Sequence, residues 1–108
     1  MQEPVRVTGM VLEVSPVGET DRRVVLLTKV RGKISAFARG ARKQGSRLMA
    51  ATNPFCFGEF ILYEGRNSYS LSEAVIRNYF EDMRMHFEEA CYGMYFLELM
   101  DYYTRENN

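Results

Sequence analysis

The chain has 108 residues, enough for one hydrophobic core and one small domain. It is 46% hydrophobic and 26% charged, a balance typical of globular proteins and too apolar for a disordered chain. The net charge is zero, but residues 1–21 carry one base and four acids, residues 22–47 nine bases and no acid, and residues 48–108 four bases and ten acids. This asymmetry indicates a polyanionic partner for the central segment, unless the basic face simply pairs with the acidic half.

The same survey excludes several classes of protein. No basic leader followed by an apolar run opens the chain, and no stretch approaches the roughly 20 apolar residues of a membrane span. We therefore expect a cytoplasmic location and no membrane contact. Two cysteines, Cys56 and Cys91, are too few for a four-ligand zinc site, so we expect buried thiols, no metal and no cofactor.

The first predicted strand, residues 4–14, has a fault in its alternation. Apolar residues change parity around Gly9, and a glycine at such a point predicts a bulge or bend. A first strand that bends can serve both halves of a small closed sheet. Residues 15–21 are rich in turn formers and are predicted to be a loop.

Two further strands follow. Residues 23–30 are apolar on both parities, which suits a central strand, and the pair Arg31-Gly32 predicts a two-residue hairpin to a strand over residues 33–39. In this third strand, alternation predicts that one face holds Ile34, Ala36 and Ala38, and the other Lys33, Ser35, Phe37 and Arg39.

A long link and two more strands complete the predicted sheet. Residues 40–53 are small and basic, so we expect no contribution to the core and mobile, solvent-exposed cations. Residues 54–63 predict a fourth strand bent at Gly58, residues 64–68 a turn, and residues 69–76 a fifth strand.

The periodicity becomes helical after residue 77. Asn78 and Glu81 fit a helix N-cap with its capping-box partner. Residues 91–103 are apolar on nearly every side, which predicts a covered helix and suggests self-association or further helical sequence.

These elements predict a mainly β fold, a five-stranded Greek-key barrel of the OB type over residues 1–77, followed by one or two helices in residues 78–108. An SH3-like barrel is the main competitor. It also has five strands, but it does not need a bent first strand.

Catalysis has little support in the sequence. The single histidine, His86, has no partner nucleophile, and no glycine-rich loop matches a phosphate-binding fingerprint. Glu19 and Asp21 alone would make a poor divalent-cation site. We therefore expect a protein that is not an enzyme.

Single-stranded nucleic acid is the better fit. The third strand predicts Phe37 between Lys33 and Arg39, so that the ring can stack on a base while the cations meet phosphates. The alternative is that the helix or the long link covers Phe37. The link adds Arg42, Lys43 and Arg47, which suit sequence-tolerant contacts with a nucleic-acid backbone.

An ordered series of short segments resembles the N-terminal region of the bacterial RecO family, across roughly residues 4–100. The segments are residues 18–21 (GETD), 32–36 (GKISA), 38–43 (ARGARK), 46–48 (SRL), 54–55 (PF) and 59–64 (EFILYE). The resemblance implies an OB-fold domain followed by a helical domain. It also implies binding of single- and double-stranded DNA, strand annealing in recombinational repair, and the partners RecR and single-strand-binding protein. Family chains continue through a longer helical region, often with a cysteine zinc site, so residues 78–108 are expected to be the start of a truncated helical domain.

The family pattern places DNA on the second and third strands and the link. It implies contacts from seven cations, and Phe37 is added by the alternation: the predicted DNA-binding set is Arg22, Arg23, Lys33, Phe37, Arg39, Arg42, Lys43 and Arg47. Two other functions fit the same basic strip. An OB domain could dock the acidic tail of a protein partner, and no residue distinguishes RNA from DNA.

Overall fold

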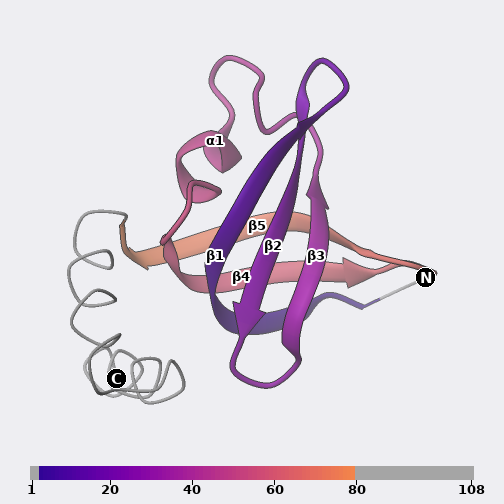
Figure 1. Cartoon of the computed structure of the whole chain (residues 1–108), viewed down its shortest axis with the longest axis vertical. Helices are drawn as coiled ribbons and strands as arrows, with labels where there is room; N and C mark the ends of the chain where they lie inside the picture. Colours follow the sequence, from indigo (N-terminus) through magenta and orange to yellow (C-terminus); the bar gives the residue numbers. More distant parts are fainter. Residues whose placement is uncertain (1–2, 80–108) are drawn as a thin grey trace.

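The computed structural model describes residues 3–79, which form a closed five-stranded barrel with one short helix (Figure 1). The elements in chain order are β1 (Val5–Val17), β2 (Asp21–Thr28), β3 (Gly32–Ala38), α1 (Arg47–Ala51), β4 (Phe57–Glu64) and β5 (Tyr69–Asn78).

The strand order around the barrel is β1-β2-β3-β5-β4, and β1 also pairs with β4 to complete the circle. All pairs are antiparallel except β3 with β5, which are parallel and joined only through Ala36 with Tyr69 and Phe37 with Ser70. The helix α1 lies between β3 and β4 in the chain. This confirms the predicted OB-type barrel, and the long shared first strand favours it over the SH3-like alternative.

Strand β1 closes the barrel because it pairs with two neighbours. Its first half pairs with β4 and its second half with β2, and residues 9 and 10 pair with both. Gly9 permits the bend, since a Cβ there would lie 2.8 Å from the carbonyl oxygen of Leu27. The register of β1 against β2 shifts at Leu12 and not at Gly9, a bulge that the sequence did not reveal. The strand also continues to Val17, so the predicted loop shrinks to residues 18–20.

The connection between β2 and β3 differs from the predicted two-residue hairpin. Thr28 pairs with Gly32, which leaves a three-residue loop, and Gly32 has a φ of 68°. The Thr28 hydroxyl donates to the Gly32 carbonyl at 2.7 Å and accepts from the Arg31 N–H at 2.9 Å. The glycine thus serves as the left-handed residue that ends a longer turn, rather than as half of a short one.

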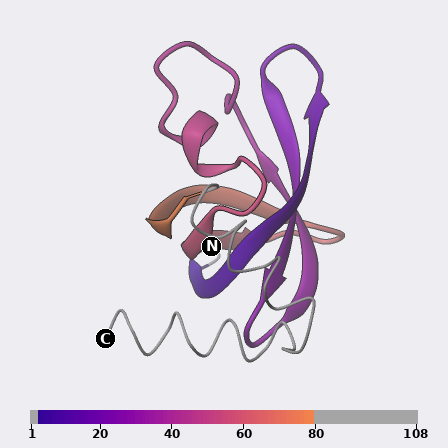
Figure 2. The same cartoon turned by 60° about the vertical axis from the view of Figure 1, so that its left-hand side comes forward.

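The link after β3 contributes to the core, contrary to the prediction. Ala41 and Ala51 are buried, and Leu48 packs against the core cluster. Ser46 caps α1 by accepting the Leu48 N–H at 3.1 Å. The helix covers one end of the barrel, and the part of the link that precedes it runs beside the loop between β1 and β2 (Figures 1 and 2). A five-residue helix was too short to produce a visible period.

The last two strands match their predictions with shifted limits. The register of β4 shifts at Gly58, which confirms the bend. Strand β4 begins at Phe57 and not at residue 54, and β5 continues to Asn78, which pairs with Phe57. The predicted helices, including the capping partner Glu81 and the apolar residues 91–103, lie outside the described residues.

We predict that Gly58→Ala lowers the free energy of unfolding by about 3 kcal/mol, the upper end for an overpacked site. A Cβ at Gly58 would lie 2.1 Å from the carbonyl oxygen of Val75, and this backbone atom cannot rotate away. Gly18→Ala is the matched control because Gly18 has open space around it. Its φ of 58° is the one source of strain, and we expect the substitution to lower the free energy of unfolding by about 1 kcal/mol. Urea unfolding of both variants measures the difference, and equal losses of stability would contradict the close approach.

Candidate nucleic-acid interface

The outer face of β2 and β3 carries the predicted contact residues of these strands. Ala36 and Ala38 are buried inside the barrel, while Lys33 and Arg23 are exposed on the outside, so the predicted alternation is confirmed. Arg23 and Phe37 are direct partners across the two strands, and Arg23 donates from Nη2 to the Ser35 hydroxyl at 2.9 Å. Basic, hydroxyl and aromatic groups thus share one surface.

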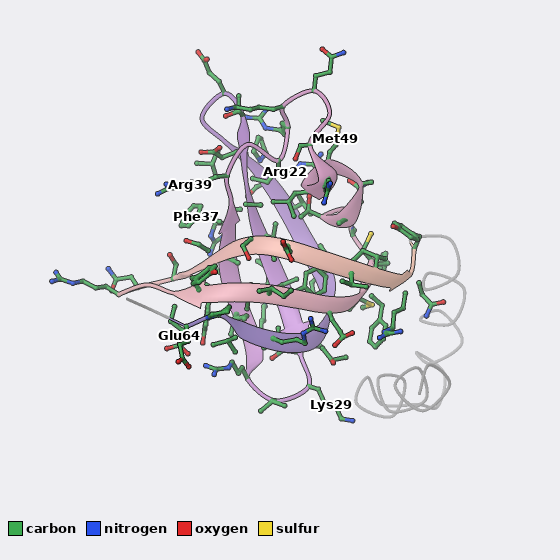
Figure 3. All side chains as sticks on the ribbon, turned by 180° about the vertical axis from the view of Figure 1, so that it is seen from behind. Arg22, Lys29, Phe37, Arg39, Met49 and Glu64 are labelled. Carbon is green, nitrogen blue, oxygen red and sulfur yellow. The ribbon has the colours of Figure 1, made fainter. Side chains whose placement is uncertain are left out.

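Phe37 lies at the edge of this surface, where β3 meets β5. It is half-buried, pairs with Ser70, and does not belong to the apolar side chains that pack against the core. In Figure 3, Phe37 and Arg39 lie on the same side of β3, with α1 on the other. Helix α1 of the link therefore does not cover Phe37, which is partly exposed among the described residues, and the predicted C-terminal helix lies outside them.

Three cations of the link are exposed, and two of them, Arg39 and Lys43, lie close to the end of β3. Arg39 directly follows the strand, Lys43 ends a turn in which its N–H donates to the Gly40 carbonyl at 3.0 Å, and Arg47 begins α1. Among residues 3–79, the side chains of these three make no hydrogen bond and no ion pair.

Arg22, also a predicted contact residue, has a different environment. Its Nη1 donates to the Met49 carbonyl at 3.0 Å, the Thr52 hydroxyl at 2.9 Å and the Asn53 side-chain oxygen at 3.3 Å. Figure 3 shows it beside α1 and away from Phe37. Arg22 therefore fastens α1 to the start of β2.

Arg42 is likewise engaged, contrary to the expectation of a mobile side chain. Its Nε donates to the Asp21 carbonyl at 3.0 Å and its Nη2 to the Gly18 carbonyl at 2.6 Å. The Asp21 carboxylate accepts the Gly40 N–H at 2.7 Å, and this bond holds the pKa of the carboxyl below its ordinary value. Thr20 and the charges of Arg39 and Lys43 act in the same direction, partly opposed by desolvation.

Carboxylates neutralise a different set of arginines. Arg77 and Arg6 both bind Glu59, at 2.8 and 3.1 Å, and together they lower the pKa of Glu59, with Arg77 the larger cause. Arg31 binds Glu64 at 2.6 Å. None of the eight predicted contact residues takes part in an ion pair within the described part of the chain.

Other chemistry finds no support in the barrel. Residues 3–79 contain no group of three His, Cys, Asp or Glu side chains able to hold a metal ion, and no helix that could serve as a membrane span. Cys56 is a buried free thiol, as predicted, and burial raises its pKa. Cys91 and His86 lie outside the described residues.

Comparison with known proteins shows the family of the chain. Residues 1–80 match the family described as "Recombination protein O N terminal". The chain belongs to this RecO N-terminal family. The resemblance read from the short sequence segments is therefore confirmed.

Curated relatives of the RecO N-terminal domain are named DNA repair protein RecO. The relative from Alkaliphilus metalliredigens is 36% identical over 102 residues, which are 94% of this chain and 42% of the relative. That from Clostridium novyi is 38% identical over 92 residues, 85% and 36% of the two chains. That from Acetivibrio thermocellus is 32% identical over 102 residues, 94% and 41%. The chain thus spans about two-fifths of the length of these RecO proteins.

Sequence reasoning missed the residues that support this basic surface. It grouped Arg22 and Arg42 with the exposed cations, because a charge run does not reveal which guanidinium meets backbone carbonyls. It assigned Asp21 only to a turn or a weak metal site. A signal for α1 was present in Ser46 followed by Leu48 and Ala51, a cap and two apolar positions three residues apart.

We predict that Arg22→Ala destabilises the barrel by about 1–2 kcal/mol, because it removes the hydrogen bonds of a charged donor to α1. Arg23→Ala changes the charge equally but removes one exposed hydrogen bond, so we expect less than about 0.5 kcal/mol. Thermal unfolding of both variants measures the difference. If the two were equally stable, Arg22 would not anchor the helix.

Proposed function

We propose that this chain is a DNA-binding domain of a DNA repair protein, which holds single-stranded DNA on the outer face of β2 and β3 and on the link that follows. The observation that carries the proposal is the separation of charge. Three of the four arginines that the described barrel holds outside this face, Arg6, Arg31 and Arg77, are paired with glutamates, the exception being Arg66. The predicted contact residues form no ion pair in the described barrel.

The surface suits a flexible polyanion. Lys33 and Arg39 stand at opposite ends of β3, roughly 20 Å apart at the rise of an extended strand. Phe37 lies between them with its ring partly accessible. In this arrangement the cations neutralise phosphates and release counterions, while the ring stacks on a base without reading its identity.

Arg23, Lys33, Phe37, Arg39, Lys43 and Arg47 are proposed to touch DNA, with Arg22 and Arg42 supporting them. The same cations would reduce the repulsion between two strands, which accounts for annealing and for contact with double-stranded DNA. Relatives named DNA repair protein RecO support this role. We further propose, from the family, partnership with RecR and single-strand-binding protein, a cytoplasmic location and no enzymatic step.

We predict that Arg39→Gln with Lys43→Gln weakens binding of a labelled oligonucleotide, because two phosphates are then no longer neutralised. The logarithmic salt dependence of the association constant should become shallower by about 0.7 for each of these phosphates. Both side chains are exposed and without ion pairs among residues 3–79. Fluorescence anisotropy over a range of salt concentrations measures both quantities.

The matched control is Arg6→Gln with Arg77→Gln, which removes the same charge from the glutamate-paired arginines. It should change affinity far less. If both double variants weakened binding equally, only net charge would matter and the site assignment would be wrong. If an acidic peptide displaced the oligonucleotide at matched ionic strength while being bound more tightly, the surface would be a protein-docking site.

We predict that Phe37→Ala weakens oligonucleotide binding by about 1–3 kcal/mol, the value of one stacked base. The salt dependence should stay unchanged, because every phosphate keeps its cation. Phe37→Tyr keeps the ring and should bind like the parent chain. An affinity unaffected by the alanine substitution would show that the ring does not meet a base.

A further inference from the structure

An acidic residue borders the basic segment of the interface. Asp21 begins β2, and its side chain lies close enough to Arg39 and Lys43 for their charges to act on it. On charge alone, this carboxylate repels a polyanion and weakens the attraction of its two cationic neighbours. Its place at the proposed DNA surface therefore needs another reason.

The hydrogen bonds of Asp21 supply that reason. Its carboxylate accepts the Gly40 N–H at 2.7 Å and the Thr20 hydroxyl at 3.2 Å. Gly40 follows Arg39 and has a φ of 67°, a conformation that glycine adopts without steric cost. The carboxylate thus fixes the backbone at the point where the chain leaves β3.

Arg42 also joins these two segments, through hydrogen bonds from the link to the loop between β1 and β2. Its guanidinium donates to the carbonyls of Asp21 and Gly18, and its own N–H donates to the Thr20 carbonyl at 2.8 Å. Between these bonds, Ala41 is buried in the core. We call the hydrogen bonds of Asp21 and Arg42 across these two segments the Asp21–Arg42 clasp.

Two cations that form no ion pair among residues 3–79 adjoin the clasp. Arg39 stands immediately before the anchored Gly40, and Lys43 donates its N–H to the Gly40 carbonyl and lays its side-chain carbons beside Gly40. A cation held in place loses less conformational freedom when it binds a phosphate than one on a loose loop.

We propose that Asp21 is a positioning residue for DNA, which acts with Arg42 to hold Arg39 and Lys43 at the interface. This inference rests on the proposed DNA-binding function. Simple electrostatics predicts that removal of a negative charge from the DNA surface strengthens DNA binding. The positioning role of Asp21 predicts that it weakens DNA binding.

The test compares Asp21→Ala with Asp21→Asn in the 108-residue chain, using a labelled single-stranded oligonucleotide. The two changes alter the charge equally, but asparagine keeps an oxygen that can accept the Gly40 N–H. We expect Asp21→Ala to bind about fivefold more weakly than the parent, the effect of one hydrogen bond, and Asp21→Asn to restore binding to the parental level or better. Equal tightening in both variants would overturn the proposal.

Arg42→Lys provides an independent arm that does not depend on Asp21. It preserves the charge but cannot reproduce the bonds of the planar guanidinium to two carbonyls. We expect weaker binding with an unchanged salt dependence, as befits a residue that holds others in place. Parental affinity in Arg42→Lys would indicate a simple phosphate contact and would also overturn the clasp.

Amide hydrogen exchange measured by NMR separates failure of the clasp from failure of the proposed function. We expect faster exchange at Gly40 and Arg42 in Asp21→Ala, with protection retained in Asp21→Asn. If the parent chain did not bind the oligonucleotide, the proposed function would fail and the positioning role with it. If the parent bound but exchange at Gly40 and Arg42 were unchanged in Asp21→Ala, the clasp alone would fail.

Discussion

Closure of the barrel depends on one constraint, that a single strand must hydrogen-bond to two neighbours that diverge from each other. Strand β1 meets this constraint by bending, and its 13 residues divide between β4 and β2. Two glycines make the backbone approaches possible, Gly9 against Leu27 and Gly58 against Val75. Once β1 is bent, the order of the remaining strands follows, and β2 and β3 are left with an outer face that no other described strand covers.

The positive charge of that outer face depends on where ion pairs form in the barrel. Glu59 and Glu64 lie on β4, so they meet Arg6, Arg77 and Arg31 on adjoining elements. The stretch from residue 22 to residue 47, which has no acid, supplies most of β2, all of β3 and most of the link, so that Asp21 at the start of β2 is the one carboxylate among these elements. A net charge of zero for the chain therefore conceals a strongly polarised domain.

Much of this architecture could be predicted from the sequence, because alternation and glycine placement are local signals. The five strands, the bends at Gly9 and Gly58 and the outward direction of Lys33 and Arg39 were all accessible in this way. The roles of Arg22 and Arg42 were not, because their partners are carbonyls and hydroxyls that come together only in the folded chain. The three-residue turn before Gly32 was missed because a glycine can either sit within a short hairpin loop or end a longer one.

The parallel pairing of β3 with β5 is the narrowest seam of the barrel, since only two residue pairs join the strands. Phe37 lies on this seam beside Ser70. A ligand that stacks on the Phe37 ring and contacts both β3 and β5 would hold these strands together where the fewest residue pairs join them. Ligand binding and the stability of the domain would then be thermodynamically linked, so that the bound domain resists local opening more than the free domain.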